Sequence, residues 1–297
     1  TNVINPSVSV ITKIGLDHKE FLGETLREIA LQKAGIIKKG IPVVSALQED
    51  EAMTVIEKRS SEMGCPLYIY ERDFKGDLKD LTPAGLIFDY RDNGFELKDL
   101  FIPLTGTHQL ENACLAIKAA SLFTGQLDSE KVKYALKNIY WSGRLELFKA
   151  DGMHFLFDGA HNPQAAERLS EALRDIYRKF YKRIILILGI MADKDIDGIV
   201  RAFDGLCDII ISTRPDYNRA LEAEKLKKKI EALHNYNSSI YNAETVRKAI
   251  EMAGNLYRQG DLVVITGSFY TVGEAKVILG ERESLRTLRE SMEKKNP

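Results

Sequence analysis

The sequence predicts an α/β protein of two domains: first a mostly parallel sheet with an antiparallel stretch, then a small doubly wound, Rossmann-like sheet. Runs of β-branched residues alternate with helix-length segments along most of the chain, which is typical of parallel sheets. Arg183 to Gly189 is almost continuously apolar, as expected for a central strand that is covered on both faces. The 297 residues suffice for about two domains of roughly 150 residues, with cores that need no disulfide or structural metal.

We expect the first domain to cover residues 1–141. Apolar and β-branched runs predict strands over residues 8–14, 41–46, 67–69, 85–90 and 95–102. The last two flank the turn sequence Asp92-Asn93-Gly94, so this stretch is more antiparallel in character. The spacing of apolar residues predicts helices over residues 24–37, 49–63, 110–123 and 130–139.

The second domain is expected to cover residues 142–297, after the segment Tyr140-Trp141-Ser142-Gly143. Here strands are predicted over residues 145–149, 153–158, 183–189, 208–213 and 261–266. Helices are predicted over residues 163–180, 196–203, 220–234 and 243–257, and after the last strand as far as residue 279. The charged tail from residue 281 is expected to be helical or frayed.

Charge and cysteine content restrict the class of protein. Lys and Arg number 42 and Asp and Glu 43, and a net charge of −1 argues against binding nucleic acid or a membrane surface through bulk charge. The three cysteines are widely spaced and form no C-x-x-C pair, so we expect no disulfide framework and no zinc site. This usage fits the reducing cytoplasm. We see no apolar run long enough to span a bilayer and no secretory leader.

Three polar positions of the first domain could carry chemistry. Asp17 and His18 follow the first strand, where they could ligate a metal or act in acid–base chemistry, or Asp17 could only cap a helix. Lys33 lies on an apolar helix stretch, where a lysine ordinarily extends its ammonium to solvent.

Asn112 lies inside a predicted helix, where Asn is unfavourable. Its amide could pair with a purine edge, or it could face solvent. Thr105 or Thr107 is expected to cap this helix.

In the second domain, the sequence Phe157-Asp158-Gly159-Ala160-His161-Asn162-Pro163 joins a strand to a helix. Asn162 suits the N-cap and Pro163 the first turn, which leaves Asp158 and His161 directed into the crevice above the sheet. Helix N-terminal amides in such a crevice can hold a phosphate. The turn Gly267-Ser268-Phe269-Tyr270 is expected to face the same crevice.

Several nucleotide and ester-hydrolysis motifs are absent from the sequence. No Gly is followed by Lys, so the G-x-x-x-x-G-K-[ST] phosphate loop is absent. No two glycines are two residues apart, which excludes G-x-G-x-x-G, and G-x-S-x-G is missing as well. The second domain is therefore a poor candidate for a dinucleotide-binding dehydrogenase or an esterase.

Taken together, six stretches resemble the folylpolyglutamate synthase/dihydrofolate synthase family of the Mur ligase superfamily. They run from Val8 to Ala275, and GLDHKEFLG and FDGAHNP are the most specific. Gln32 departs from the family, which often has Glu before the lysine. The matching stretches are SVITKIGLDHKEFLGETLREIALQKAGIIKKGIPVV, GTHQLENACLAI, WSGRLELF, FDGAHNPQAA, LILGIMADKD and ITGSFYTVGEA.

The resemblance implies a partial Mur ligase central domain followed by a C-terminal domain. It implies an ATP-dependent, ADP-forming ligase that joins L-glutamate to a pteroate or folate carboxylate through an acyl phosphate. ATP and Mg²⁺ would be its cofactors, folate or dihydropteroate and glutamate its substrates, and the full-length protein would be a cytoplasmic monomer with no nucleic-acid or membrane partner.

The resemblance also implies roles for particular residues. His18 would be a magnesium ligand, and Lys33 the lysine that the family carbamylates, which would replace a cation by an anionic metal ligand. Asn112 would contact adenine, Arg144 the ATP phosphates and Asp158 the ribose hydroxyls. The remaining candidates, near the phosphates or the incoming glutamate, are His161, Ser268, Tyr270, Asp193 and Lys194.

Family members carry a G-K-S phosphate loop upstream of the segment equivalent to Thr1. We therefore expect residues 1–141 to be the remainder of a central ATPase domain, with a sheet short of strands, and this chain alone to be unable to bind ATP productively. The alternatives are another amino-acid ligase of the superfamily, such as a peptidoglycan-building enzyme, and a non-catalytic truncated remnant.

Overall fold

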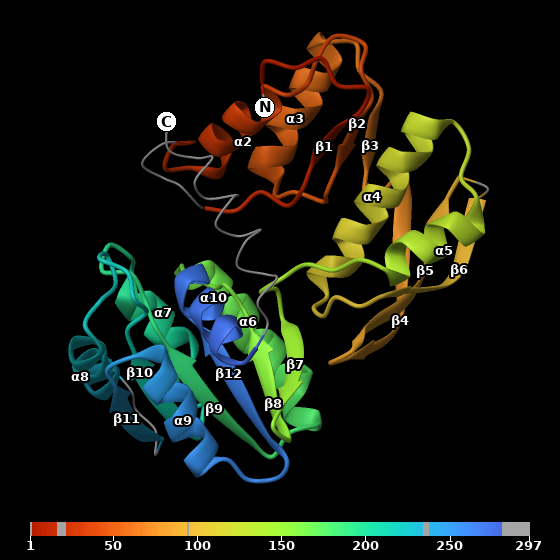
Figure 1. The fold of residues 1–297 in the computed structure, drawn as a ribbon. Coiled ribbons are helices and arrows are strands. Elements are labelled where there is room, and N and C mark those ends of the chain that lie inside the picture. Colours follow the sequence, from red (N-terminus) through yellow and green to blue (C-terminus); the bar gives the residue numbers. More distant parts are fainter. Residues whose placement is uncertain (1, 17–21, 94, 234–237, 281–297) are drawn as a thin grey trace. The chain divides into compact units, whose positions relative to one another are not determined.

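A computed structural model describes residues 2–16, 22–93, 95–233 and 238–280 (Figure 1). The chain forms two compact units. The first comprises Thr1–Leu81 and Gly85–Ile139, and the second comprises Thr82–Ala84 and Tyr140–Pro297. The first unit contains two sheets and the second contains one.

The first unit contains a parallel sheet in the order β1-β2-β3. Two helices, α2 (Leu26–Ala34) and α3 (Asp50–Glu62), pack against each other and share a core with the sheet, which includes Ile29, Ile11 and Val43. Among the described residues, β1 pairs with β2 and with no strand on its other side. The strands are β1 (Ser9–Ile11), β2 (Val43–Ser45) and β3 (Leu67–Ile69).

An antiparallel sheet in the order β4-β5-β6 completes the first unit. Its strands are β4 (Phe74–Thr82), β5 (Gly85–Asp92) and β6 (Phe95–Ile102). Helix α4 (His108–Thr124) joins the two sheets, because its Cys114 lies in one core with Val44 of β2 and Phe88 of β5. Helix α5 (Ser129–Lys137) packs on β6.

The second unit is built on a six-stranded sheet in the order β11-β10-β9-β12-β8-β7. All neighbouring pairs are parallel except β7 and β8, which form a hairpin. The strands are β7 (Glu146–Ala150), β8 (Met153–Phe157), β9 (Arg183–Leu188), β10 (Ile209–Thr213), β11 (Ser239–Ala243) and β12 (Asp261–Thr266).

Helices cover both faces of this sheet (Figure 1). α9 (Val246–Leu256) and α10 (Phe269–Ile278) pack against one face, in a core that contains Phe157, Ile187 and Ile265. α6 (Pro163–Asp175) and α7 (Ile196–Ala202) pack together on the other face, and α8 (Ala223–Leu233) contacts α7 and β10. The predicted α/β class and doubly wound second domain are confirmed.

The sequence prediction omits two strands, and four predicted helices differ from the structure by three residues or more at one end. β4 and β11 are edge strands with polar sequences, so neither shows a clean apolar alternation. The helix predicted over residues 24–37 ends at Ala34, where Gly35 forms its C-cap. The helix predicted to reach residue 180 ends at Asp175 and is followed by a 3₁₀ turn, Tyr177–Lys179, in which Tyr177 is fully buried. The helix predicted from residue 220 begins at Ala223, because Ala220 forms a β-bridge with Met191.

The helix predicted from residue 243 begins at Val246, since Ala243 ends β11. The side chain of Thr107 does not cap α4, because Thr107 already has helical backbone angles and its hydroxyl accepts no helix N–H. The predicted turn residue Gly94 and the tail from residue 281 lie outside the described residues. Within the described part of the chain, every helix is too short or too polar to cross a bilayer.

Candidate functional site

Asp158 organises the carboxyl end of β8 in the second unit. Its side chain is 8% exposed, and its two oxygens accept hydrogen bonds from the backbone N–H of Leu145 at 3.0 Å and of Ala160 at 2.9 Å. Burial raises the pKa of Asp158, against the lowering effects of these N–H groups and of the charges of Arg144 and His161. The carboxylate therefore ties together the two loops on either side of the hairpin β7–β8.

Phe269, in the first turn of α10, is the residue around which the candidate side chains gather. The guanidinium carbon of Arg144 lies 5.1 Å from the centre of the Phe269 ring, and the His161 ring lies 5.9 Å from it. A side chain at Gly159 would collide with this ring, because an added Cβ would lie 2.3 Å from it. Glycine at position 159 thus lets the Asp158 loop approach the start of α10.

The turn from β12 into α10 requires a glycine at position 267. Gly267 has a φ of +100°, and its N–H donates to the carbonyl oxygen of Ala160 at 3.1 Å. The next residue, Ser268, is 2% exposed and caps α10, since its hydroxyl accepts the N–H of Thr271 at 3.0 Å. Ser268 therefore lies at the predicted place, with its hydroxyl already used within the protein.

His161 follows Asp158 at the start of α6. Asn162 caps this helix by accepting the N–H of Ala165 at 2.8 Å, and Pro163 occupies the first turn, as predicted. Nδ1 of His161 lies 2.8 Å from the carbonyl oxygen of Gly159. Because a carbonyl oxygen only accepts, Nδ1 carries the hydrogen in the neutral ring and Nε2 is left as an acceptor.

Three further candidates, Tyr270, Asp193 and Lys194, lie in the second unit. The rings of Tyr217 and Tyr270 lie 3.9 Å apart at 16°, and a hydrogen bond with Tyr217 together with partial burial raises the pKa of Tyr270. Asp193 forms an ion pair with Arg219 at 2.7 Å and a weaker one with Lys194 at 3.6 Å. No sequence motif marks Tyr217 or Arg219, so sequence analysis does not predict these two neighbours of the candidate residues.

In the first unit, Lys33 and Asn112 are both exposed. Lys33 lies in the last turn of α2, a helix that starts with a capping box between Thr25 and Glu28. Asn112 lies in α4, and its amide donates to the side chain of Gln109 at 3.3 Å. Exposure of Lys33 agrees with the simple interpretation of a solvated lysine and leaves its amine accessible for modification.

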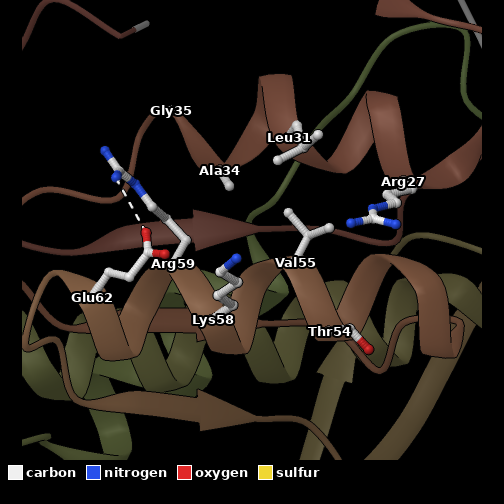
Figure 2. A pocket seen from close by; sticks show the side chains of 9 residues that line it. All are labelled: Arg27, Leu31, Ala34, Gly35, Thr54, Val55, Lys58, Arg59 and Glu62. Carbon is white, nitrogen blue, oxygen red and sulfur yellow. Dashed lines mark ion pairs between the residues drawn. The ribbon is translucent and has the colours of Figure 1, made fainter.

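A hollow of about 330 Å³ lies between α2 and α3 (Figure 2). Lys33 does not line it. Basic side chains from both helices, Arg27, Lys58 and Arg59, lie along its length, and Arg59 pairs with Glu62 at 3.7 Å. Leu31, Ala34 and Val55 form its apolar wall.

His18 lies outside the described residues, as does Asp17. The backbone that leads toward them is fixed by Gln48, which is 6% exposed, accepts the N–H of Ile14 at 2.9 Å and donates to the carbonyl oxygen of Thr12 at 3.0 Å. No group of three or more His, Cys, Asp or Glu residues that could hold a metal ion occurs in the described ranges.

Two family profiles match the sequence. The Mur ligase middle domain matches residues 1–120, and the Mur ligase, glutamate ligase domain matches residues 143–269. The dihydrofolate synthase/folylpolyglutamate synthase of Bacillus subtilis is 31% identical over 280 residues, which cover 93% of this chain and 63% of the relative. The enzyme of the same name from Mycobacterium tuberculosis is 31% identical over 305 residues, with 94% and 62% covered.

Solved structures agree with these similarities. Mycobacterium tuberculosis folylpolyglutamate synthase complexed with ADP matches with a TM-score of 0.84 and 30% identity, over 94% of this chain and 64% of that chain. The folylpolyglutamate synthase from Thermotoga maritima matches with a TM-score of 0.80 and 29% identity, over 94% and 62%. The chain spans about 63% of the length of the Bacillus subtilis relative.

Proposed function

Because the chain belongs to the folylpolyglutamate synthase/dihydrofolate synthase branch of the Mur ligase family, we propose that it works in an ATP-dependent, ADP-forming glutamate ligase. The reaction would join the amine of L-glutamate to a carboxylate of a folate or dihydropteroate. The observation that carries the proposal is that Arg144 and His161 both lie against Phe269. Phe269 directly follows Ser268, and it also meets Gly159, the residue after Asp158.

In the proposed reaction, the acceptor carboxylate takes the γ-phosphoryl group of ATP, and ADP leaves. The glutamate nitrogen then attacks the acyl carbon, the C–N bond forms and inorganic phosphate departs. Both steps concentrate negative charge on phosphate oxygens, so they call for fixed cations and for a base that removes a proton from the amine.

Arg144 fits the role of a phosphate-binding cation. Its guanidinium is permanently charged and exposed, and it forms no ion pair with another described residue. His161 is the proposed base, because Nε2 of its neutral ring is free to accept while Nδ1 is held by Gly159. Arg144 and His161 would therefore contact the reacting groups, whereas Asp158 is proposed to bind the ribose hydroxyls of ATP.

Asn112 in the first unit remains our proposed adenine contact, on the strength of its exposed amide. Tyr270, Asp193 and Lys194 are proposed to contribute to the glutamate site. Ser268 is proposed to act near the phosphates, with its hydroxyl anchored by the N–H of Thr271.

Magnesium remains part of the proposal, with His18 and Lys33 as its protein ligands. An unmodified Lys33 ammonium is a cation and cannot ligate Mg²⁺, so its role depends on carbamylation, which its exposure permits. When bound, magnesium would neutralise phosphate charge.

Residues 1–141 are proposed to be the remainder of the ATPase domain and residues 142–297 the C-terminal domain. The absence of a G-K-[ST] sequence supports the further proposal that this stretch of chain alone does not bind ATP productively. The cytoplasm is the proposed compartment, since all three cysteines are unpaired.

The test is a substrate-dependence assay on the full-length protein. We expect ADP release that requires both a folate acceptor and glutamate, and a folate product that is one glutamate longer. A UDP-sugar peptide should not replace the folate. Ligation onto such a peptide instead would favour a cell-wall ligase, and ADP release without any amide product would contradict the proposal.

A further inference from the structure

A buried ion pair lies beside the segment that enters the second unit. Lys276 of α10 is 0% exposed, and its Nζ lies 2.6 and 2.7 Å from the two carboxylate oxygens of Glu146 on β7. The same ammonium donates to the hydroxyl of Ser142 at 2.9 Å and lies 3.2 Å from that of Tyr140. A lysine buried to this degree is costly unless its charge is matched in this way.

Glu146 also binds the backbone of the segment before it. It accepts the N–H of Gly143 at 2.7 Å and the hydroxyl of Tyr140 at 2.7 Å. Gly143 is also held from the other side, because its carbonyl oxygen accepts the N–H of Gly159 at 2.9 Å. Residues 140–143 are therefore held in place by the ion pair of Lys276 and Glu146.

Arg144 lies between two residues whose backbone is held by hydrogen bonds, Gly143 before it and Leu145 after it. Leu145, the next residue, donates its N–H to the buried Asp158 at 3.0 Å. Gly143 and Leu145 are both buried, while Arg144 between them is exposed. The chain thus holds both neighbours of Arg144 and leaves only its side chain free to meet a ligand.

The backbone in this segment needs such a restraint. Gly143 has a φ of +69° and Leu145 a φ of +47°, and the second value is unfavourable for a residue with a β-carbon. A strained conformation of this kind persists only where surrounding contacts determine it. Lys276 and Glu146 provide those contacts on one side, and Asp158 provides them on the other.

We propose that the Lys276–Glu146 pair is a positioning device that holds Arg144 over Phe269 so that its guanidinium meets the phosphates of ATP. The inference rests on the proposed role of Arg144. α10 supplies both parts of the arrangement: Phe269 under the guanidinium in its first turn, and Lys276 two turns further on. Buried ion pairs often add little net stability, which makes a positioning role the more specific explanation.

The experiment compares steady-state kinetics of the full-length enzyme and its variants. In Lys276→Met/Glu146→Leu both charges are removed together, so neither is left unpaired. We expect the KM for ATP to rise about tenfold, because a guanidinium displaced by about 1 Å loses its charge-assisted hydrogen bonds. The KM for glutamate should not change. Arg144→Ala should raise the KM for ATP as well, and combining it with the paired variant should add nothing further.

A second ion pair, in which the carboxylate is buried and the guanidinium is partly exposed, provides the control. Arg183 and Asp261 form an ion pair at 2.5 Å, with Asp261 1% exposed, at the amino ends of β9 and β12. Arg183→Met/Asp261→Leu should lower the melting temperature without changing the KM for ATP. An equal rise in both paired variants would show a general loss of stability and overturn the inference.

Two further outcomes separate the inference from the function on which it rests. Should Arg144→Ala raise the KM for ATP while Lys276→Met/Glu146→Leu does not, the positioning role alone is wrong. Should Arg144→Ala leave the KM for ATP unchanged, the proposed role of Arg144 is wrong.

If the paired variant does not fold, Tyr140→Phe, which removes one donor to Glu146 at an exposed side chain, is used instead. Its expected rise is about twofold to threefold, and no rise contradicts the inference.

Discussion

Gly267→Ala is the substitution for which the structure allows the clearest estimate. Gly267 has a φ of +100°, a region that L-residues rarely adopt. A Cβ built on it would lie 2.5 Å from the carbonyl oxygen of Gly189, an atom of the backbone that cannot rotate away. Since Gly267 sets the start of α10, the substitution would also disturb Ser268 and Phe269.

The magnitude has two parts. The unfavourable φ costs about 1–2 kcal/mol, and forcing extra volume against fixed backbone costs about 1–3 kcal/mol more. We therefore expect Gly267→Ala to lower the free energy of unfolding by about 2–5 kcal/mol, measured by equilibrium urea unfolding followed by circular dichroism.

Gly260→Ala is the matched control, because Gly260 has nearly the same φ, +94°, at the other end of β12. Its added Cβ would meet only side-chain atoms of Lys182, at 3.5 Å or more. This variant should lose only the conformational part, about 1–2 kcal/mol. Equal losses for the two alanines would refute the steric argument for Gly267.

Three other predictions concern charge and surface. Burial raises the pKa of Glu274 above its ordinary value of 4.5, although the hydrogen bond from the N–H of Asp216 acts to lower it. The contribution of Glu274 to the free energy of unfolding therefore falls as the pH rises above 4.5. Glu274→Gln should therefore be more stable than the parent at pH 7, by less than about 1 kcal/mol because the group is partly exposed, and the difference should vanish below about pH 4; a difference that grows on acidification would contradict this. Lys33→Ala should abolish ligation in the full-length enzyme while the exposed site leaves the melting temperature unchanged, and retained activity would remove Lys33 from the proposal. Val10→Lys on β1, which has no strand on one side among the described residues, should slow aggregation of the 297-residue chain, as light scattering would show, whereas unchanged aggregation would mean that this edge is not responsible.

The strands that the sequence predicted correctly are those with a strong apolar signal. Residues 67–69, 95–102 and 261–266 have the predicted bounds, since β-branched and apolar residues mark them clearly. The edge strands β4 and β11 carry polar residues on exposed positions and were not recognisable in this way.

The candidate site was predictable where it follows strand ends. Asp158, His161 and Ser268 lie at strand-to-helix turns, and the sequence placed all three there. The Lys276–Glu146 pair was not predictable, because its members are 130 residues apart and each is an ordinary charged residue in its own element. Only the packing of α10 on the sheet brings them together.

The most direct test of the central claim is product analysis with the purified full-length protein, ATP, Mg²⁺, a folate acceptor and glutamate. We predict one ADP released for each glutamate joined to the folate, and no ADP release when either acceptor or glutamate is omitted. A protein that releases ADP equally well without glutamate, or that forms no amide product under any of these conditions, would contradict the assignment as a folate–glutamate ligase.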